Sequence, residues 1–160
     1  MFSGEELVAE LRVMGVTHVV WLPDSTLGAW DRALEGAEDI DLIRVSREAE
    51  AWGIAAGLYL GGQTPLVVMQ CTGLFDSGDA LRNFVFDYEL PLFALIGYRS
   101  SLNPTANDSA RTYTEPILKA WGLDYVYVRE AGDLPLVREH WHRCQQAGRA
   151  GIVLIGEGRL

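Results

Sequence analysis

The stretch Ser46-Arg47-Glu48-Ala49-Glu50-Ala51-Trp52-Gly53-Ile54-Ala55-Ala56-Gly57 decides how the rest of the chain is interpreted. It follows an apolar run at 40–45 that predicts a buried strand, and beyond its first turn it is small and mostly apolar, as expected of a helix packed on a sheet. Ser46 is placed to cap this helix and Arg47 to open it. Glu48 is therefore predicted to lie at the carboxyl edge of a sheet, where open α/β folds hold their ligands.

The two acids of this helix are predicted to point in different directions. One helical face collects, by its spacing, Glu48, Trp52, Ala55 and Tyr59. Glu50 lies about 200° round the helix from Glu48, so we expect the two acids to differ in role. The alternative for Glu48 is a solvated first-turn acid that complements the helix dipole.

Short apolar runs alternate with helical patterns along the whole chain. The expected strands are 17–22, 40–45, 65–70, 91–97, 123–128 and 151–155, and the expected helices are 3–14, 26–35, 47–61, 76–88, 113–121 and 133–147. Glycines fall just past these helices, where a left-handed residue is favoured: Gly15, Gly36, Gly61 with Gly62, Gly122 and Gly148. The pattern predicts a single α/β domain over 1–160, three-layered and doubly wound, with a mostly parallel six-stranded sheet and helices on both faces.

Composition narrows the function further. Thirteen basic against 22 acidic residues give a net charge of −9, which argues against binding to nucleic acid or to an anionic membrane surface. Cys71 and Cys144 are far apart and lack metal-ligand spacing, so a reducing compartment is expected. The first residues show no targeting pattern, and no segment approaches the length of a membrane span, so we expect a cytoplasmic protein.

Four polar segments are predicted to meet at the carboxyl edge of the sheet. They are Pro23-Asp24-Ser25, Glu48, Gln70-Cys71-Thr72-Gly73 and the polar stretch Arg99 to Thr112. The last is about 14 residues long, near the length at which a structureless connection is usually functional or mobile.

Together these segments resemble the pyrimidine-binding domain of thiamine diphosphate-dependent 2-oxo acid decarboxylases, most closely the alpha subunits of sulfopyruvate decarboxylase and the matching domain of phosphonopyruvate decarboxylase. The resemblance covers nearly the whole chain. It rests on Leu22-Pro23-Asp24-Ser25-Thr26-Leu27, on Arg47-Glu48-Ala49-Glu50-Ala51 leading into Ile54-Ala55-Ala56-Gly57, on Val68-Met69-Gln70-Cys71-Thr72-Gly73-Leu74, and on Leu90-Pro91-Leu92-Phe93-Ala94-Leu95-Ile96-Gly97-Tyr98-Arg99.

The resemblance implies a role for each edge segment. Glu48 falls on the family's catalytic glutamate, which shares a proton with the cofactor's aminopyrimidine ring and so activates the cofactor. Gln70, Thr72 and Gly73 fall on a turn that lies near the pyrimidine ring, although any tight strand-to-helix turn would favour a glycine. Ser25 falls where relatives contact the substrate carboxylate, although Asp24 or Ser25 would also serve as an ordinary N-cap.

Other polar residues are weaker candidates. Arg99 and Arg111 flank the long loop and could pair with a sulfonate, phosphonate or carboxylate, or could simply be solvated. The histidines are expected in packing or surface positions: His18, His140 and His142. The remaining aromatic residues are expected in the core or at an interface rather than stacked on the cofactor: Trp121, Trp141, Tyr125 and Tyr127. The sequence departs from the family at Phe75-Asp76 and Asp79, where relatives usually have glycine and asparagine.

The chain also lacks the Gly-Asp-Gly motif and downstream asparagine with which the family holds Mg²⁺ and the cofactor diphosphate. The resemblance therefore implies a hetero-oligomer with two-fold symmetry, in which a beta-type diphosphate-binding subunit carries the metal ligands. The function it implies is decarboxylation of a small 2-oxo acid to an aldehyde. The alternatives are a regulatory or scaffolding subunit without turnover and a flavodoxin-like nucleotide binder; the latter is disfavoured because no glycine-rich turn follows the first strand.

Overall fold

A six-stranded sheet forms the centre of the computed structural model, which describes residues 1–157. Its strand order is β2-β1-β3-β4-β6-β5, and every neighbouring pair is parallel. The strands are β1 (His18–Trp21), β2 (Asp41–Arg44), β3 (Pro65–Gln70), β4 (Phe93–Tyr98), β5 (Asp124–Val128) and β6 (Gly151–Gly156). The six predicted strands are thus confirmed, and the sheet is parallel throughout.

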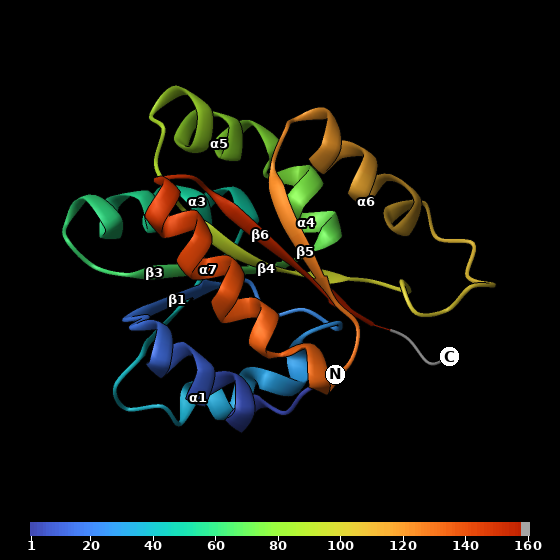
Figure 1. Cartoon of the computed structure of the whole chain (residues 1–160), viewed down its shortest axis with the longest axis horizontal. Coiled ribbons are helices and arrows are strands. Elements are labelled where there is room, and N and C mark those ends of the chain that lie inside the picture. The colour runs from blue at the N-terminus through green and yellow to red at the C-terminus, as the bar shows by residue number, and fades with distance from the viewer. Residues whose placement is uncertain (158–160) are drawn as a thin grey trace.

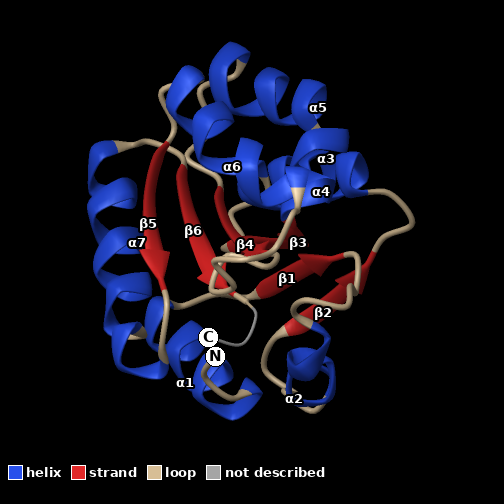
Figure 2. Cartoon of the chain, turned by 90° about the vertical axis from the view of Figure 1, so that its right-hand side faces the viewer, coloured by secondary structure: helices blue, strands red, loops and turns tan. Residues whose placement is uncertain are grey.

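Helices cover both faces of this sheet (Figures 1 and 2). One face carries α1 (Gly4–Met14), the 3-10 turn η1 (Gly28–Trp30), α2 (Asp31–Glu35) and α7 (Pro135–Ala147), which follows the 3-10 turn η3 (Ala131–Asp133). The other face carries α3 (Glu48–Leu60), α4 (Cys71–Asp76), α5 (Gly78–Arg82), the π turn η2 (Asn83–Asp87) and α6 (Ser109–Ala120). The predicted three-layer, doubly wound α/β fold is confirmed. Among the helices of residues 1–157, none combines the length and apolar character needed to cross a bilayer.

The central strands are apolar on both sides because each side packs on helices. Along β3, Leu66 and Val68 belong to the core under α1 and α7, whereas Val67 and Met69 belong to the core under α3 and α4. All four side chains are fully buried. The two cores fix the register of the sheet, since a shift of one residue would exchange them.

Two helices begin earlier than predicted. The helix expected over 76–88 starts at Cys71, directly after β3, and is divided into α4, α5 and η2. The predicted turn at 70–73 is therefore the first turn of α4, with Gln70 in extended conformation as its N-cap residue. The helix expected over 113–121 starts at Ser109, because the Asp108 side chain accepts a hydrogen bond from the Ala110 amide at 3.0 Å and caps it.

Four of the glycines after helices have the predicted left-handed conformation. Their φ values are 72° at Gly15, 81° at Gly62, 66° at Gly122 and 61° at Gly148. The prediction was wrong for Gly36 and Gly61, whose φ values are −83° and −77°. At Gly36 the helix ends without a left-handed residue, whereas at the end of α3 the left-handed residue comes one position later, at Gly62.

The strand order creates a topological switch next to β1. The chain adds β2 on one side of β1 and then crosses to add β3 on the other side. In open α/β sheets, the crevice outside the carboxyl ends of the strands at such a switch is the usual ligand site. The connections after β1, β2 and β3 are therefore the segments that build the candidate site.

Candidate functional site

The side chain of Glu48 lies directly against the backbone of Gly73. Glu48 is the first residue of α3, and Gly73 is buried in α4. A Cβ built on Gly73 would lie 2.6 Å from Glu48 Oε1 and would also overlap its Cγ. The helix that follows β2 and the helix that follows β3 thus place a half-buried carboxylate at the switch point. Among residues 1–157 that carboxylate has no hydrogen-bond partner within the chain, so it is available to a ligand.

Glu50 has a different and purely local task. Its Oε2 accepts hydrogen bonds from the backbone amides of Ser46 at 3.0 Å and of Arg47 at 3.2 Å. The prediction that Ser46 caps the helix was wrong, because the extended Arg47 occupies the N-cap position and Glu50 reaches back to cover the free amides. The two acids differ in role, as expected: Glu50 caps the helix, and Glu48 lies against Gly73 without a hydrogen-bond partner in the described chain.

Gln70 and Thr26 bring two unpartnered oxygens to the same part of the edge. Gln70 ends β3 and pairs in register with Gly97 of β4. A Cβ on Gly97 would lie 2.8 Å from Cγ2 of Thr26, so the segment after β1 crosses onto β4 beside Gln70. Thr26 Oγ1 and Gln70 Oε1 are both buried and have no hydrogen-bond partner in the described chain. Polar atoms in this condition are usually satisfied by water or a ligand.

Thr26 was missed by sequence reasoning, although a signal for it existed. A glycine inside an otherwise apolar strand, as at Gly97, often marks the close approach of another segment. That segment proves to be the Thr26-Leu27 turn.

Ser25 is exposed and has no side-chain hydrogen bond in the described chain, whereas Asp24 holds the turn. Asp24 Oδ1 accepts hydrogen bonds from the amides of Thr26 at 2.7 Å and Leu27 at 2.9 Å, and Trp21 Nε1 donates to its Oδ2 at 3.3 Å. Neither Asp24 nor Ser25 is a helix N-cap, because the next helical turn begins at Gly28 with Leu27 as its N-cap residue; Asp24 instead closes the turn that precedes it. Ser25 is left exposed at the rim and accessible to a ligand. Thr72, also assigned to the site, is half-buried in the first turn of α4.

Arg99 already has an anionic partner within the chain. Its Nε and Nη2 donate to the two oxygens of Asp108 at 2.8 and 3.0 Å, a bidentate pair across the loop after β4. The hydrogen bonds from Arg99 hold the pKa of the Asp108 carboxyl well below its ordinary range, against the opposing effect of burial. A substrate anion at Arg99 would have to compete with Asp108.

Arg111 also holds the same loop. Its Nη1 donates to the carbonyl oxygens of Asn103 at 2.6 Å and Ala106 at 3.4 Å. The loop is fixed at its other side as well, because the Leu102 amide donates to the carbonyl of Glu157 at 3.0 Å. The structure therefore shows a tied loop of 99–108, shorter than the 14 residues expected.

The remaining histidines and aromatics lie away from Glu48, as expected. His18 is at the amino end of β1 and pairs with Asp41, His142 is exposed on α7, and His140 is fully buried there. Trp141 is buried, and Trp121 is partly exposed at the end of α6. Tyr125 Oη donates to Glu115 at 2.7 Å, and Tyr127 packs beside Tyr98.

One group of three possible metal-ligating side chains occurs within residues 1–157: Asp124, His140 and Cys144. Arg143 donates to His140 Nδ1 at 2.6 Å, so a fixed cation already occupies that nitrogen. Burial raises the pKa of the Cys144 thiol to about 11 and lowers the pKa of His140, so both are neutral at pH 7. The group is a packing cluster between β5 and α7, far from the carboxyl edge.

The residues that depart from the family pattern have local partners. Asp76 lies 3.9 Å from Arg47, next to Glu48, and Asp79 pairs with Arg82 at 3.1 Å. Phe75 packs against the core under α3 and α4. These side chains are accommodated without disturbing the contact between Glu48 and Gly73.

Comparisons with known proteins give a consistent result, although no family model matches the chain. The chain is 32% identical over 127 residues to the sulfopyruvate decarboxylase subunit alpha of Methanococcus maripaludis, covering 78% of this chain and 76% of that one. It is 31% identical over 121 residues to the sulfopyruvate decarboxylase of Methanosarcina acetivorans, covering 74% of this chain and 31% of the relative. It is 28% identical over 99 residues to the phosphonopyruvate decarboxylase of Streptomyces viridochromogenes, covering 62% of this chain and 25% of the relative.

A solved structure of 2-oxoglutarate:ferredoxin oxidoreductase from Magnetococcus marinus superimposes with a TM-score of 0.70 at 11% identity, over 97% of this chain and 29% of that one. At that identity the likeness concerns the fold alone, a doubly wound parallel α/β domain. The sequence relatives are more specific. The chain belongs to the family of sulfopyruvate decarboxylase alpha subunits.

Proposed function

We propose that this chain is the pyrimidine-binding subunit of a thiamine diphosphate-dependent decarboxylase that acts on a small 2-oxo acid resembling sulfopyruvate or phosphonopyruvate. Residues 1–160 form one pyrimidine-binding domain in this proposal. The observation that carries it is the Glu48 carboxylate held on Gly73 at the switch point, with no hydrogen-bond partner in the described chain. The names of the relatives support the reaction type.

The side chains at this edge suit the cofactor. Glu48 offers a free carboxylate oxygen, and Gln70 and Thr26 offer buried oxygens that still need donors. Bound thiamine diphosphate supplies the carbon nucleophile and the electron sink for loss of carbon dioxide. Glu48 would hold the proton shared with the ring nitrogen of the aminopyrimidine. Gln70, Thr72 and Gly73 would line the ring, with Gly73 acting chiefly as the surface that seats Glu48.

Substrate and partner contacts complete the proposal. Ser25, exposed on the turn after β1, would contact the substrate carboxylate. Arg99 and Arg111 would read a second anionic group only by exchanging their present partners in the loop. The ligands for Mg²⁺ and the diphosphate would come from a beta-type subunit in a two-fold symmetric hetero-oligomer.

The test is hydrogen-deuterium exchange at the thiazolium carbon in the enzyme reconstituted with a diphosphate-binding chain. Glu48→Gln is expected to keep the assembly and to lower turnover by roughly two to four orders of magnitude, the scale for a positioned proton-transfer group. Glu50→Gln is the matched control, since an amide can still accept the two backbone hydrogen bonds. Exchange at the wild-type rate in Glu48→Gln would refute the catalytic assignment and leave the regulatory-subunit alternative.

A further inference from the structure

Trp52 and Ser77 form a buried hydrogen bond one helical turn away from the contact between Glu48 and Gly73. Trp52 Nε1 donates to Ser77 Oγ at 2.9 Å, and both side chains are fully buried. The Ser77 hydroxyl in turn donates to the carbonyl oxygen of Leu74 at 3.4 Å. Within residues 1–157 the bond between Trp52 and Ser77 is the one side-chain hydrogen bond that joins α3 to the α4–α5 segment.

Four residues close a ring of contacts between α3 and α4, which we call the clamp: Glu48, Trp52, Ser77 and Gly73. Trp52 lies one turn after Glu48 on α3. Ser77 lies one turn after Gly73, and its amide donates to the Gly73 carbonyl at 2.9 Å. Glu48 completes the ring, because a Cβ on Gly73 would lie 2.6 Å from its Oε1. The two helices are thus joined at two levels, by a buried hydrogen bond and by the proposed catalytic side chain.

Apolar packing alone fixes the position of α3 only weakly. Apart from Trp52, the buried residues of this helix are all alanines, and its larger side chains are only partly buried: Ile54, Leu58 and Tyr59. Short side chains form shallow ridges, which hold a helix loosely against its neighbours. A buried hydroxyl is costly unless it is hydrogen-bonded, so the directional bond from Trp52 to Ser77 selects one arrangement among several of similar packing.

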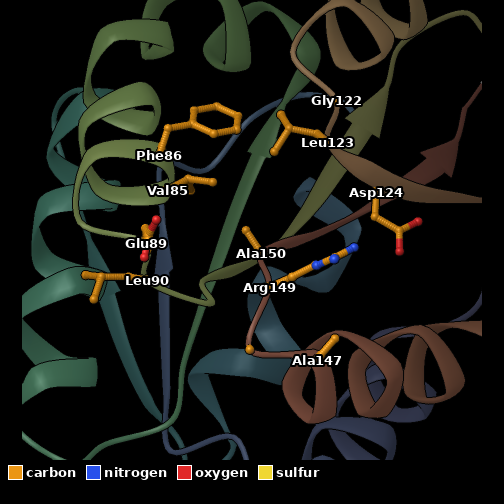
Figure 3. A pocket seen from close by; sticks show the side chains of 11 residues that line it. Val85, Phe86, Glu89, Leu90, Gly122, Leu123, Asp124, Ala147, Arg149 and Ala150 are labelled. Carbon is orange, nitrogen blue, oxygen red and sulfur yellow. The ribbon is translucent and has the colours of Figure 1, made fainter.

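The clamp lies apart from the cavity at the amino edge of the sheet. That cavity has a volume of about 410 Å³ and is lined by the connections at 85–90, 122–124 and 147–150, which lead into β4, β5 and β6 (Figure 3). None of the four clamp residues lines it. Substitutions in the clamp therefore act on the Glu48 edge without opening or filling that cavity.

We propose that Trp52 and Ser77 are positioning residues for Glu48: their hydrogen bond holds α3 in the register that seats the carboxylate on Gly73. The inference rests on the proposed function, in which Glu48 is the proton-transfer group. A displacement of about 1 Å near a reacting group lowers a rate by about 100-fold, so the register of α3 sets how well Glu48 performs that transfer.

The first experiment measures the contact between Glu48 and Gly73 in the free chain, without cofactor. A Cβ on Gly73 would overlap Glu48 Cγ, so the γ protons of Glu48 lie next to an α proton of Gly73 and give a strong nuclear Overhauser effect. The double variant Trp52→Phe with Ser77→Ala replaces both partners by apolar groups and leaves no buried donor unsatisfied, so it is expected to fold. Its Overhauser effect is expected to weaken severalfold. Wild-type strength in the folded double variant would overturn the proposal.

Trp30→Phe is the matched control for this measurement. Trp30 is also fully buried, and its Nε1 donates to the Phe2 carbonyl at 3.1 Å in the core on the other face of the sheet. This variant loses an equivalent hydrogen bond and is expected to keep the Overhauser effect between Glu48 and Gly73. Ser77→Ala, the smaller change, gives the same measurement if the double variant does not fold. An equal weakening in Trp30→Phe would show a general effect of stability and would overturn the proposal.

The second experiment measures hydrogen-deuterium exchange at the thiazolium carbon in the reconstituted complex. The double variant is expected to slow exchange about 10- to 100-fold, but to add no further loss when Glu48→Gln is already present, because the effect passes through that carboxylate. An equal added loss in both backgrounds would overturn the proposal. Exchange at the wild-type rate in Glu48→Gln alone would instead refute the proposed function, while the Overhauser effect would still report whether the clamp holds Glu48.

Discussion

The residue at position 73 must be a glycine because the Glu48 side chain fills the space that a Cβ would need. The backbone conformation at Gly73 does not itself require a glycine. Its φ lies outside the left-handed region, so the conformation alone would accept alanine. What excludes a Cβ is the carboxylate of Glu48, whose Oε1 would lie only 2.6 Å away. A single methyl group at this position is therefore expected to move the proposed catalytic carboxylate.

Gly73→Ala should lower turnover of the assembled enzyme by roughly 10- to 100-fold, because a displacement of about 1 Å at a reacting group has an effect of that size. The fold should persist, since the Glu48 side chain can rotate away. The measurement combines turnover with thiazolium hydrogen-deuterium exchange. Gly57→Ala is the control: nothing lies within 4 Å of a Cβ there, so helix propensity alone should stabilise the chain by up to about 1 kcal/mol. Full turnover in Gly73→Ala would contradict this account.

Single residues also show where sequence reasoning reached its limit at the site. Glu48 was predicted from its place after a strand, and the structure puts it at the start of α3, against Gly73 at the carboxyl edge of the sheet. The role of Glu50 as a helix cap and that of Asp24 as the residue that closes a turn depend on which of several neighbouring polar groups forms the local hydrogen bond. Such competitions are decided by differences of about 1 kcal/mol, too small to be read from residue identity.

At the scale of elements, the loop after β4 is tied to the start of α6 through Asp108. This carboxylate caps the helix through the Ala110 amide and binds both donors of Arg99. The polar composition of the segment predicted a long free loop, because composition does not reveal pairing between residues nine positions apart. The early start of α4 was missed for a similar reason: Gln70 and Cys71 have no strong capping tendency, and packing on β3 and β4 sets that helix boundary.

The low pKa of Asp108 predicts an acid-sensitive contribution to stability. Folding lowers the pKa of Asp108, so its ionised carboxylate adds to the free energy of unfolding. This contribution is fully present at pH values above the ordinary carboxyl pKa of about 4, and it is lost as the pH falls below that value. Asp108→Asn should therefore destabilise the chain at pH 7 by about 1 to 3 kcal/mol, and the difference from wild type should shrink toward pH 2. Urea denaturation between pH 2 and pH 7 measures both quantities.

Arg99→Gln separates the two roles of Asp108. The hydrogen bonds from Arg99 are the main cause of the low pKa, so this variant should lose most of the pH dependence that Asp108 confers while keeping the helix cap. An Asp108→Asn difference that stays constant from pH 7 to pH 2 would show that the ion pair contributes nothing measurable.

At the scale of the whole molecule, the two edges of the sheet differ in kind. The amino edge holds a formed cavity of about 410 Å³, whereas the Glu48 edge presents a carboxylate and two unpartnered oxygens without a described metal cluster beside them. Alternation of apolar runs and helical patterns was enough to predict six strands and two helical layers, because each layer must cover one apolar face. That pattern carries no information about a neighbouring chain. A second subunit that supplies the metal and diphosphate ligands beside Glu48 is therefore a proposal.

The purified chain alone is expected to bind thiamine diphosphate with Mg²⁺ weakly or not at all, because the proposed pyrimidine contacts reach only one part of the cofactor and the diphosphate carries most of its charge. With a net charge of −9, the chain also repels a free diphosphate. Calorimetry on the chain alone and on its complex with a co-expressed diphosphate-binding subunit measures the difference, which should be at least about 100-fold in Kd. Removing Mg²⁺ with a chelator should weaken binding to the complex and leave the isolated chain unchanged. Tight, magnesium-dependent binding to the isolated chain would contradict a site divided between two subunits.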